Sequence, residues 1–155
     1  MKIERKFARA NKWTFKIKPI QSLLERYMGT PLFPNGIWAD PFAGTSSWAK
    51  ITNDINPDMP TMYHLDALEF FKTVPMTNRL EGVLFDPPYS YRQISEHYAS
   101  VGIKASQLDT SYNFYSRVMD AANKKIKRGG YAISFGWISN GFGKKRGFEI
   151  LEILL

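Results

Sequence analysis

The chain has 155 residues, 44% of them hydrophobic, and a formal net charge of +7, which is enough apolar sequence for one packed domain and excludes a wholly disordered chain. Cysteine is absent and histidine occurs only at His64 and His97, which excludes a disulfide framework, a thiol nucleophile and a zinc site built from cysteines or several histidines. No apolar run is long enough to cross a membrane and none follows the basic start as in a signal peptide, so we expect a soluble, cytoplasmic protein.

The first half of the chain predicts two helices and three short strands. Apolar residues recur with helical spacing over residues 19–28, and we expect this helix to begin at Pro19 and to end at Gly29. Asp66 is expected to cap a second helix that continues through Phe71. The three short apolar runs predict strands, over residues 36–39, 50–52 and 61–65.

The second half predicts a long helix and three more strands. A compact apolar strand at 82–85 ends at Asp86 and two prolines. Residues 110–127 are expected to form a helix that stops at the glycine pair 129–130. The last strands are expected over residues 131–137 and 148–155. Short apolar strands separated by helices favour an α/β fold with a mostly parallel sheet, and the whole chain, 1–155, is expected to be a single domain.

Carboxylates follow four of these predicted strands, at Asp40, Asp54, Asp66 and Asp86. The carboxyl ends of parallel strands meet at one edge of a sheet, where ligands bind in α/β proteins. Four acidic side chains at that edge would suit a polar, cationic ligand. Each has an alternative local interpretation, as a turn residue or as a helix cap.

The segment Asp86-Pro87-Pro88-Tyr89 has an unusual set of hydrogen-bonding groups. Two consecutive prolines fix φ and remove two backbone donors, so that carbonyl oxygens are presented without competing N–H groups. Asp86 adds a further acceptor and Tyr89 adds an aromatic ring. This combination suits a planar substrate with an amino group. The alternative is a proline-rich turn in which Tyr89 serves only for packing.

These four residues resemble the catalytic tetrapeptide of the S-adenosylmethionine-dependent adenine-N6 DNA methyltransferases. Residues 40–44 (Asp-Pro-Phe-Ala-Gly) resemble the cofactor-binding segment of the same family, and the two motifs come in the family's order and at the ends of predicted strands. Residues 13–19 resemble the N-terminal segment that closes over the methionine part of the cofactor. The resemblance covers nearly the whole chain and implies a Rossmann-like class I methyltransferase fold, with a mostly parallel sheet flanked by helices.

The resemblance also implies a set of cofactor-binding residues. Gly44 would permit a close approach of the backbone, with Asp40 near the amino group of the cofactor. Asp54 would hold the ribose hydroxyls and Asp66 would accept a hydrogen bond from the adenine amine. The full set is Thr14, Phe15, Lys18, Asp40, Phe42, Ala43, Gly44, Asp54 and Asp66.

A reaction mechanism follows from the same resemblance. The target adenine would leave the duplex, because its amine is engaged in base pairing, and would stack on Tyr89. Asp86 and the carbonyl of Pro87 would accept hydrogen bonds from the exocyclic amine and so orient the nitrogen lone pair toward the methyl group. The expected partners are S-adenosylmethionine and double-stranded DNA, without a metal ion or a membrane.

The chain departs from the family pattern at three places. Ser46 replaces the last glycine of the cofactor motif, and only ten positions separate Gly44 from Asp54, so we expect a shortened first crossover. After residues 148–155 nothing remains to form the family's final antiparallel strand. We therefore expect a C-terminally truncated or degenerate member, or one that receives a strand from a second copy or another partner. A separate target-recognition domain is not expected.

Positive charge gathers at the two ends of the chain. Residues 1–30 carry a net charge of +6 and residues 111–155 carry +5, around a middle part of −4. The segments 90–110 and 139–147 are the candidates for contact with DNA. The expected phosphate-binding residues are Arg92, Lys144, Lys145 and Arg146, of which the last three could equally form a solvated loop.

Two further functions remain open from the sequence. An adenine-N6 methyltransferase that acts on RNA would use the same tetrapeptide, and nothing in the chain reads a 2′-hydroxyl. A catalytically inactive methyltransferase-like module that binds nucleic acid would explain the absent strand and recognition domain. The intact Asp86-Pro87-Pro88-Tyr89 segment argues against the inactive module, because a scaffold has no need of it.

Overall fold

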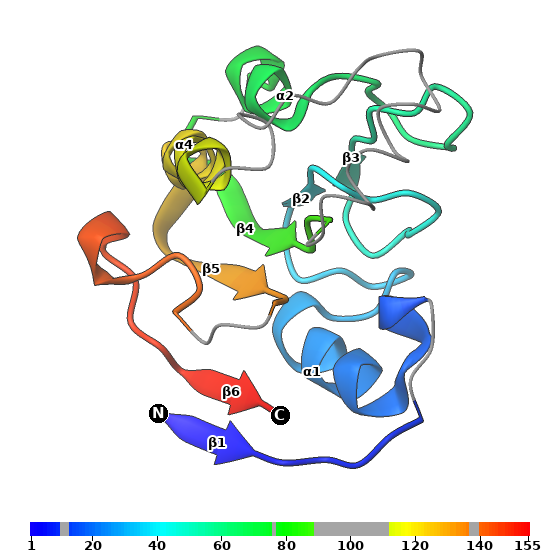
Figure 1. The fold of residues 1–155 in the computed structure, drawn as a ribbon, viewed down its shortest axis with the longest axis vertical. Coiled ribbons are helices and arrows are strands. Elements are labelled where there is room, and N and C mark those ends of the chain that lie inside the picture. The colour runs from blue at the N-terminus through cyan, green and yellow to red at the C-terminus, as the bar shows by residue number, and fades with distance from the viewer. Residues whose placement is uncertain (10–12, 76, 89–111, 137–139) are drawn as a thin grey trace.

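A four-stranded parallel sheet lies at the centre of the computed structural model (Figure 1), which describes residues 1–9, 13–75, 77–88, 112–136 and 140–155. The strands follow the order β3-β2-β4-β5, and each neighbouring pair is parallel. Their bounds are β2 (Trp38–Asp40), β3 (Ile51–Thr52), β4 (Leu80–Phe85) and β5 (Ile126–Ser134). The expected α/β architecture with a parallel sheet is confirmed.

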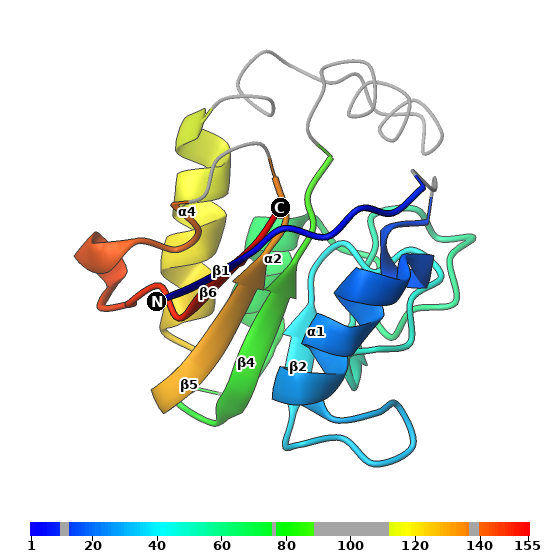
Figure 2. The ribbon, with the colours of Figure 1, turned by 90° about the horizontal axis from the view of Figure 1, so that it is seen from below.

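Helices cover both faces of this sheet (Figures 1 and 2). Helix α1 (Lys18–Met28) covers one face, and α2 (Ala67–Thr73) and α4 (Tyr112–Asn123) cover the other. As predicted, Pro19 lies in the first turn of α1, and Gly29 ends the helix with a φ of 73°. None of the helices in the described ranges is both long and apolar enough to cross a lipid bilayer.

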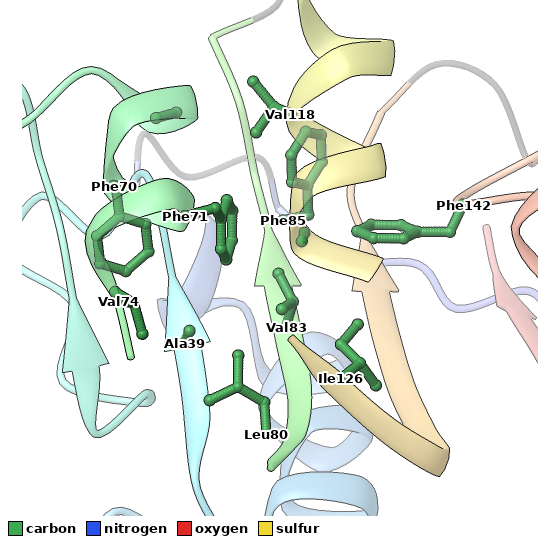
Figure 3. Packing of buried hydrophobic residues seen from close by; sticks show 12 residues of the cluster. Ala39, Phe70, Phe71, Val74, Leu80, Val83, Phe85, Val118, Ile126 and Phe142 are labelled. Atoms are coloured by element: carbon green, nitrogen blue, oxygen red, sulfur yellow. The ribbon is translucent and has the colours of Figure 1, made fainter. Parts of the chain in front are cut away.

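The two faces of β4 form two parts of the hydrophobic core. Phe85 points toward α2 and α4, where it packs in one cluster with the fully buried Phe71 and Val118 (Figure 3). Leu84, the preceding residue, points the opposite way and packs with Leu24 of α1. Successive side chains of a strand face opposite sides of the sheet, so Leu84 and Phe85 are both buried because helices cover both faces of β4.

The glycine pair 129–130 has a different role from the one predicted. Helix α4 ends at Asn123, and β5 already begins at Ile126, so both glycines lie inside the strand. The register with β4 shifts there, from Leu80 opposite Ile126 to Gly82 opposite Tyr131. A Cβ atom on Gly130 would come within 2.6 Å of Ile126 Cγ2. The glycines thus allow an irregularity of the strand and do not end the helix, and the prediction was wrong.

Two other predicted strands also differ from the structure. Residues 61–65 form only an isolated parallel bridge, between Tyr63 and Asn53. The strand expected over 148–155 is limited to β6 (Glu152–Leu154), which pairs with β1 (Lys2–Glu4) outside the central sheet. Sequence alternation can indicate a strand, but the partner of that strand depends on tertiary contacts. Here the carboxylate of Glu152 binds α1 by accepting hydrogen bonds from Arg26 and Tyr27.

The connection between β2 and β3 is short. Residues 41–50, all of which the structure describes, form turns and bends and no helix. The expected short crossover is therefore present, and it brings the residues after β2 and those after β3 into direct contact.

Candidate active site

Three carboxylates meet at the carboxyl edge of the sheet. Asp40 is the last residue of β2, Asp54 comes two residues after β3, and Asp86 directly follows β4. Asp40 and Asp54 are 0% and 2% exposed, and Asp86 is half-buried. The charges of both Asp54 and Asp86 act on the carboxyl group of Asp40. The parallel arrangement of the strands thus brings these three predicted site residues together.

Only one oxygen of the Asp40 carboxyl group has a hydrogen-bond partner among the described residues. Its Oδ1 atom accepts a hydrogen bond from the amide of Phe42 at 2.9 Å, while Oδ2, though buried, has no hydrogen-bond partner among the described residues. Burial above all, and then the charges of Asp86 and Asp54, raise the pKa of Asp40 from 3.8 to about 8, against the opposing effect of the Phe42 amide. A buried oxygen without a partner is costly unless a ligand supplies one. Asp40 is therefore a candidate ligand-binding group.

The loop that contains Gly44 is held by the loop that follows β3. The amide of Gly44 donates to Asp54 Oδ2 at 3.0 Å, and the amide of Asn56 donates to Asp54 Oδ1 at 2.9 Å. The amide of Ala43 donates to the Asn53 carbonyl at 2.9 Å. Gly44 has a φ of 53°, and a Cβ atom there would meet only Asp54 Oδ2, at 3.8 Å. Its backbone conformation, more than crowding, therefore calls for glycine.

Asn53 is a buried residue of this edge that the sequence did not single out. Its side-chain amide donates to the carbonyls of Pro41 and Leu65 at 3.0 and 2.9 Å, and its Oδ1 accepts from the Leu65 amide at 3.0 Å. One side chain thus connects the segments after β2 and β3 with the segment that leads to Asp66. The position directly after a strand and beside Asp54 was the available sequence signal.

Residues of β4 and of the proline segment that follows it accept hydrogen bonds from the residue after β5 and from α4. The amide of Phe135 donates to the Phe85 carbonyl at 2.9 Å, just before this segment. Pro87 is buried and Pro88 is half-buried, and the hydroxyl of Tyr115 in α4 donates to the Pro88 carbonyl at 2.6 Å. Tyr115 lies within the helix that the sequence predicts over 110–127. Tyr89, the predicted stacking ring, lies outside the described residues.

Comparisons with known proteins do not identify a relative. No family model, curated protein or solved structure matches the chain. Within the described residues, no group of three or more histidine, aspartate or glutamate side chains is arranged to hold a metal ion. The function is therefore argued from the chemistry of this edge.

The remaining predicted cofactor residues lie on three other elements. Thr14 and Phe15 belong to the short helix η1 (Thr14–Lys16), and the ring of Phe15 packs edge-on against Phe135, with 5.5 Å between the ring centroids. Lys18 is exposed at the start of α1. Asp66 is the N-cap of α2 and accepts from the amide of Leu68 at 2.9 Å, as the sequence predicted.

The predicted phosphate-binding residues have unequal surroundings. Lys144 and Lys145 are exposed in η2 (Lys144–Arg146). The guanidinium group of Arg146 instead binds Asp120 Oδ1 at 2.7 Å, Ser116 Oγ at 2.7 Å and the Phe142 carbonyl at 2.9 Å. Arg146 thus attaches its loop to α4 with the donors that a phosphate would need. Arg92 lies outside the described residues.

A groove of about 1140 Å³ lies beside the outer edge of β5. Its walls are β5, the buried side of α1 and residues 140–155, including β6. Among the described strands, β5 stands at the end of the strand order, so the groove follows the edge of the sheet formed by these strands. The groove thus borders the position at which a fifth strand would pair.

Proposed function

We propose that the chain is a DNA methyltransferase, which transfers a methyl group from S-adenosylmethionine to the N6 amine of an adenine extruded from the duplex. The proposal includes a Rossmann-like class I methyltransferase fold. The observation that carries it is the juxtaposition of Asp40, with its unpartnered buried oxygen, the Gly44 loop, and the Asp86-Pro87-Pro88 segment on the adjacent strand.

The described residues fit the cofactor. Asp40 Oδ2 is buried without a partner, and a bound ammonium group would both donate to it and favour the ionised form of the carboxyl group. Around it, the loop of Phe42, Ala43 and Gly44 would contact the cofactor, Asp54 and Asp66 would accept from its hydroxyl and amine groups, and Thr14, Phe15 and Lys18 would contribute from the N-terminal segment. When bound, S-adenosylmethionine supplies an electrophilic methyl group on a sulfonium.

The segment after β4 would position the substrate. The carboxylate of Asp86 and the carbonyl of Pro87 accept hydrogen bonds from the exocyclic amine, which localises the nitrogen lone pair and sets its direction. The two prolines cannot donate to these acceptors in place of the substrate. Tyr89 would stack on the extruded base. The contribution of these residues is orientation and electrostatics, so full deprotonation of the amine is not required.

Contacts with the nucleic acid would come from few residues. Lys144 and Lys145 are exposed cations, and Arg92 adds a third basic residue outside the described ranges. A second copy or another protein would complete the sheet along the groove beside β5. Because few residues would contact the DNA, we expect the recognition sequence to be short or of low specificity.

The test is methyl transfer from labelled S-adenosylmethionine to duplex DNA and to RNA in parallel, with nucleosides separated after digestion and Asp86→Ala as the control. Label in N6-methyladenine from DNA, absent with the variant, is the expected result. Label in N6-methyladenine from RNA alone would indicate that the substrate is RNA and not DNA. Transfer to neither, under conditions in which the chain binds the cofactor, would favour an inactive nucleic-acid-binding module.

A further inference from the structure

The Asp86-Pro87-Pro88 segment accepts a hydrogen bond from a side chain of a different element. Among the described residues, the final paired positions of β4 and β5 are Phe85 and Ser134, and beyond them the amide of Phe135 donates to the Phe85 carbonyl at 2.9 Å. Beyond that point two successive residues lack an N–H group, so the segment cannot continue the ladder as a donor. The hydroxyl of Tyr115 reaches it across 27 positions of sequence and donates to the Pro88 carbonyl at 2.6 Å.

Tyr115 is itself held by aromatic neighbours from three elements. Its ring contacts Phe42 after β2 and Phe85 of β4, with 6.3 Å between centroids in each case, and Phe114 at 5.6 Å. Phe42 also packs edge-on against Phe85, at 5.4 Å. Burial raises the pKa of Tyr115 well above its ordinary value, so that the hydroxyl keeps its proton and remains a donor.

We infer that Tyr115 is a positioning residue, whose hydroxyl fixes the Pro88 carbonyl and thereby the direction of the Pro87 carbonyl and the Asp86 carboxylate. This inference rests on the proposed function. The phenol ring and the hydroxyl have separate roles: the ring packs on Phe42 and Phe85, and the hydroxyl donates to the Pro88 carbonyl. Removal of the oxygen alone should therefore slow transfer without weakening the binding of the cofactor.

Tyr115→Phe removes this oxygen and keeps the ring. The matched control is Tyr27→Phe, which also removes a hydroxyl hydrogen bond, to Glu152 at 3.0 Å, in α1. We expect Tyr115→Phe to lower the single-turnover rate of methyl transfer by about tenfold, because small displacements of positioned groups slow reactions strongly. Its dissociation constant for the cofactor, measured by calorimetry, should stay within about twofold of wild type. Tyr27→Phe should change neither quantity.

A wild-type rate in Tyr115→Phe would overturn the inference, and so would a parallel loss of rate and cofactor affinity. A second readout separates it from the proposed function. In protein labelled with carbonyl-¹³C proline, the Pro88 resonance should shift in Tyr115→Phe and stay in place in Tyr27→Phe. If wild type transfers no methyl group, the proposed function fails, while this resonance still reports whether Tyr115 holds the segment. An unchanged resonance overturns the inference in either case.

Discussion

The carboxylate of Asp54 holds the amide of Gly44, at 3.0 Å, although the two residues belong to loops that follow different strands. Its second oxygen holds the amide of Asn56. Both oxygens of one buried side chain therefore organise the backbone of the candidate cofactor site. The two bonds hold the loop after β2 and the loop after β3 at one carboxylate.

Asp54→Ala should destabilise the fold as well as the site. It removes two amide hydrogen bonds to a buried charge, and bonds of this kind contribute about 2 kcal/mol each. We expect the free energy of unfolding in urea to fall by about 2–4 kcal/mol, together with loss of cofactor binding. Asp58→Ala, at an exposed aspartate in the same loop, is the control and should leave both unchanged. Equal stability of the two variants would contradict this role of Asp54.

Gly44→Ala should weaken cofactor binding more than Gly129→Ala does. A φ of 53° is unfavourable for alanine by about 1–2 kcal/mol, and the loop would shift to relieve the strain. The control is Gly129→Ala, because Gly129 also has a positive φ, 75°, and a Cβ atom there would meet nothing within 4 Å. Both variants should lose similar stability in urea unfolding. Only Gly44→Ala should raise the dissociation constant for the cofactor.

Asp40 should make stability depend on pH. Its pKa is about 8 in the folded chain against 3.8 as a free group, so the unfolded chain ionises first as the pH rises. The free energy of unfolding should consequently decrease between about pH 4 and pH 8, with a slope of up to about 1.4 kcal/mol per pH unit from this group. The contribution is largest below about pH 4 and is lost as the pH rises to about 8.

Asp40→Asn removes this titration and keeps the shape of the side chain. Urea unfolding at several values between about pH 5 and pH 8 should give a flatter profile for the variant than for wild type. Since Asp86 raises the pKa of Asp40, Asp86→Ala should lower the pH at which the decrease in stability ends, so that the total decrease from Asp40 is smaller than in wild type. Parallel profiles for wild type and Asp40→Asn would show that Asp40 is ionised in the folded chain.

Asp86→Ala should separate catalysis from cofactor binding. The half-buried carboxylate follows β4 and lies outside the Gly44 loop, so its removal leaves the hydrogen bonds of that loop in place. We expect transfer to fall by at least about 10²-fold, as for other groups that stabilise charge at a reacting atom. Calorimetric titration should show cofactor affinity close to that of wild type. Full transfer by the variant would exclude Asp86 from the mechanism.

The exposed lysines of η2 should determine part of the salt dependence of DNA binding. Each cation that neutralises a phosphate contributes about 0.9 to the slope of log K against log salt. The double variant Lys144→Ala/Lys145→Ala should therefore reduce this slope by about 2, measured by fluorescence anisotropy with a duplex. Lys72→Ala, at an exposed lysine of α2 that pairs with Glu69, should leave the slope unchanged. An unchanged slope in the double variant would place the nucleic acid on another surface.

Local sequence was sufficient wherever a few adjacent residues decide the structure. Pro19 and Gly29 delimit α1, Asp66 caps α2, and Asp40 and Asp86 each stand where an apolar strand ends. Proline, a glycine with positive φ and a capping carboxylate act on the backbone within one turn, so their effect can be predicted without the rest of the fold.

Tertiary structure alone decided the relationships that join distant segments. The pairing of β6 with β1, the irregularity at 129–130 and the hydrogen bond from Tyr115 to Pro88 each involve a partner that no local pattern specifies. The raised pKa of Asp40 has the same origin, because it requires burial and two carboxylates from other strands. The sequence by itself therefore determined which chemical groups stand at the strand ends. Folding determined which of them meet, because contact between remote residues depends on how the sheet and helices pack.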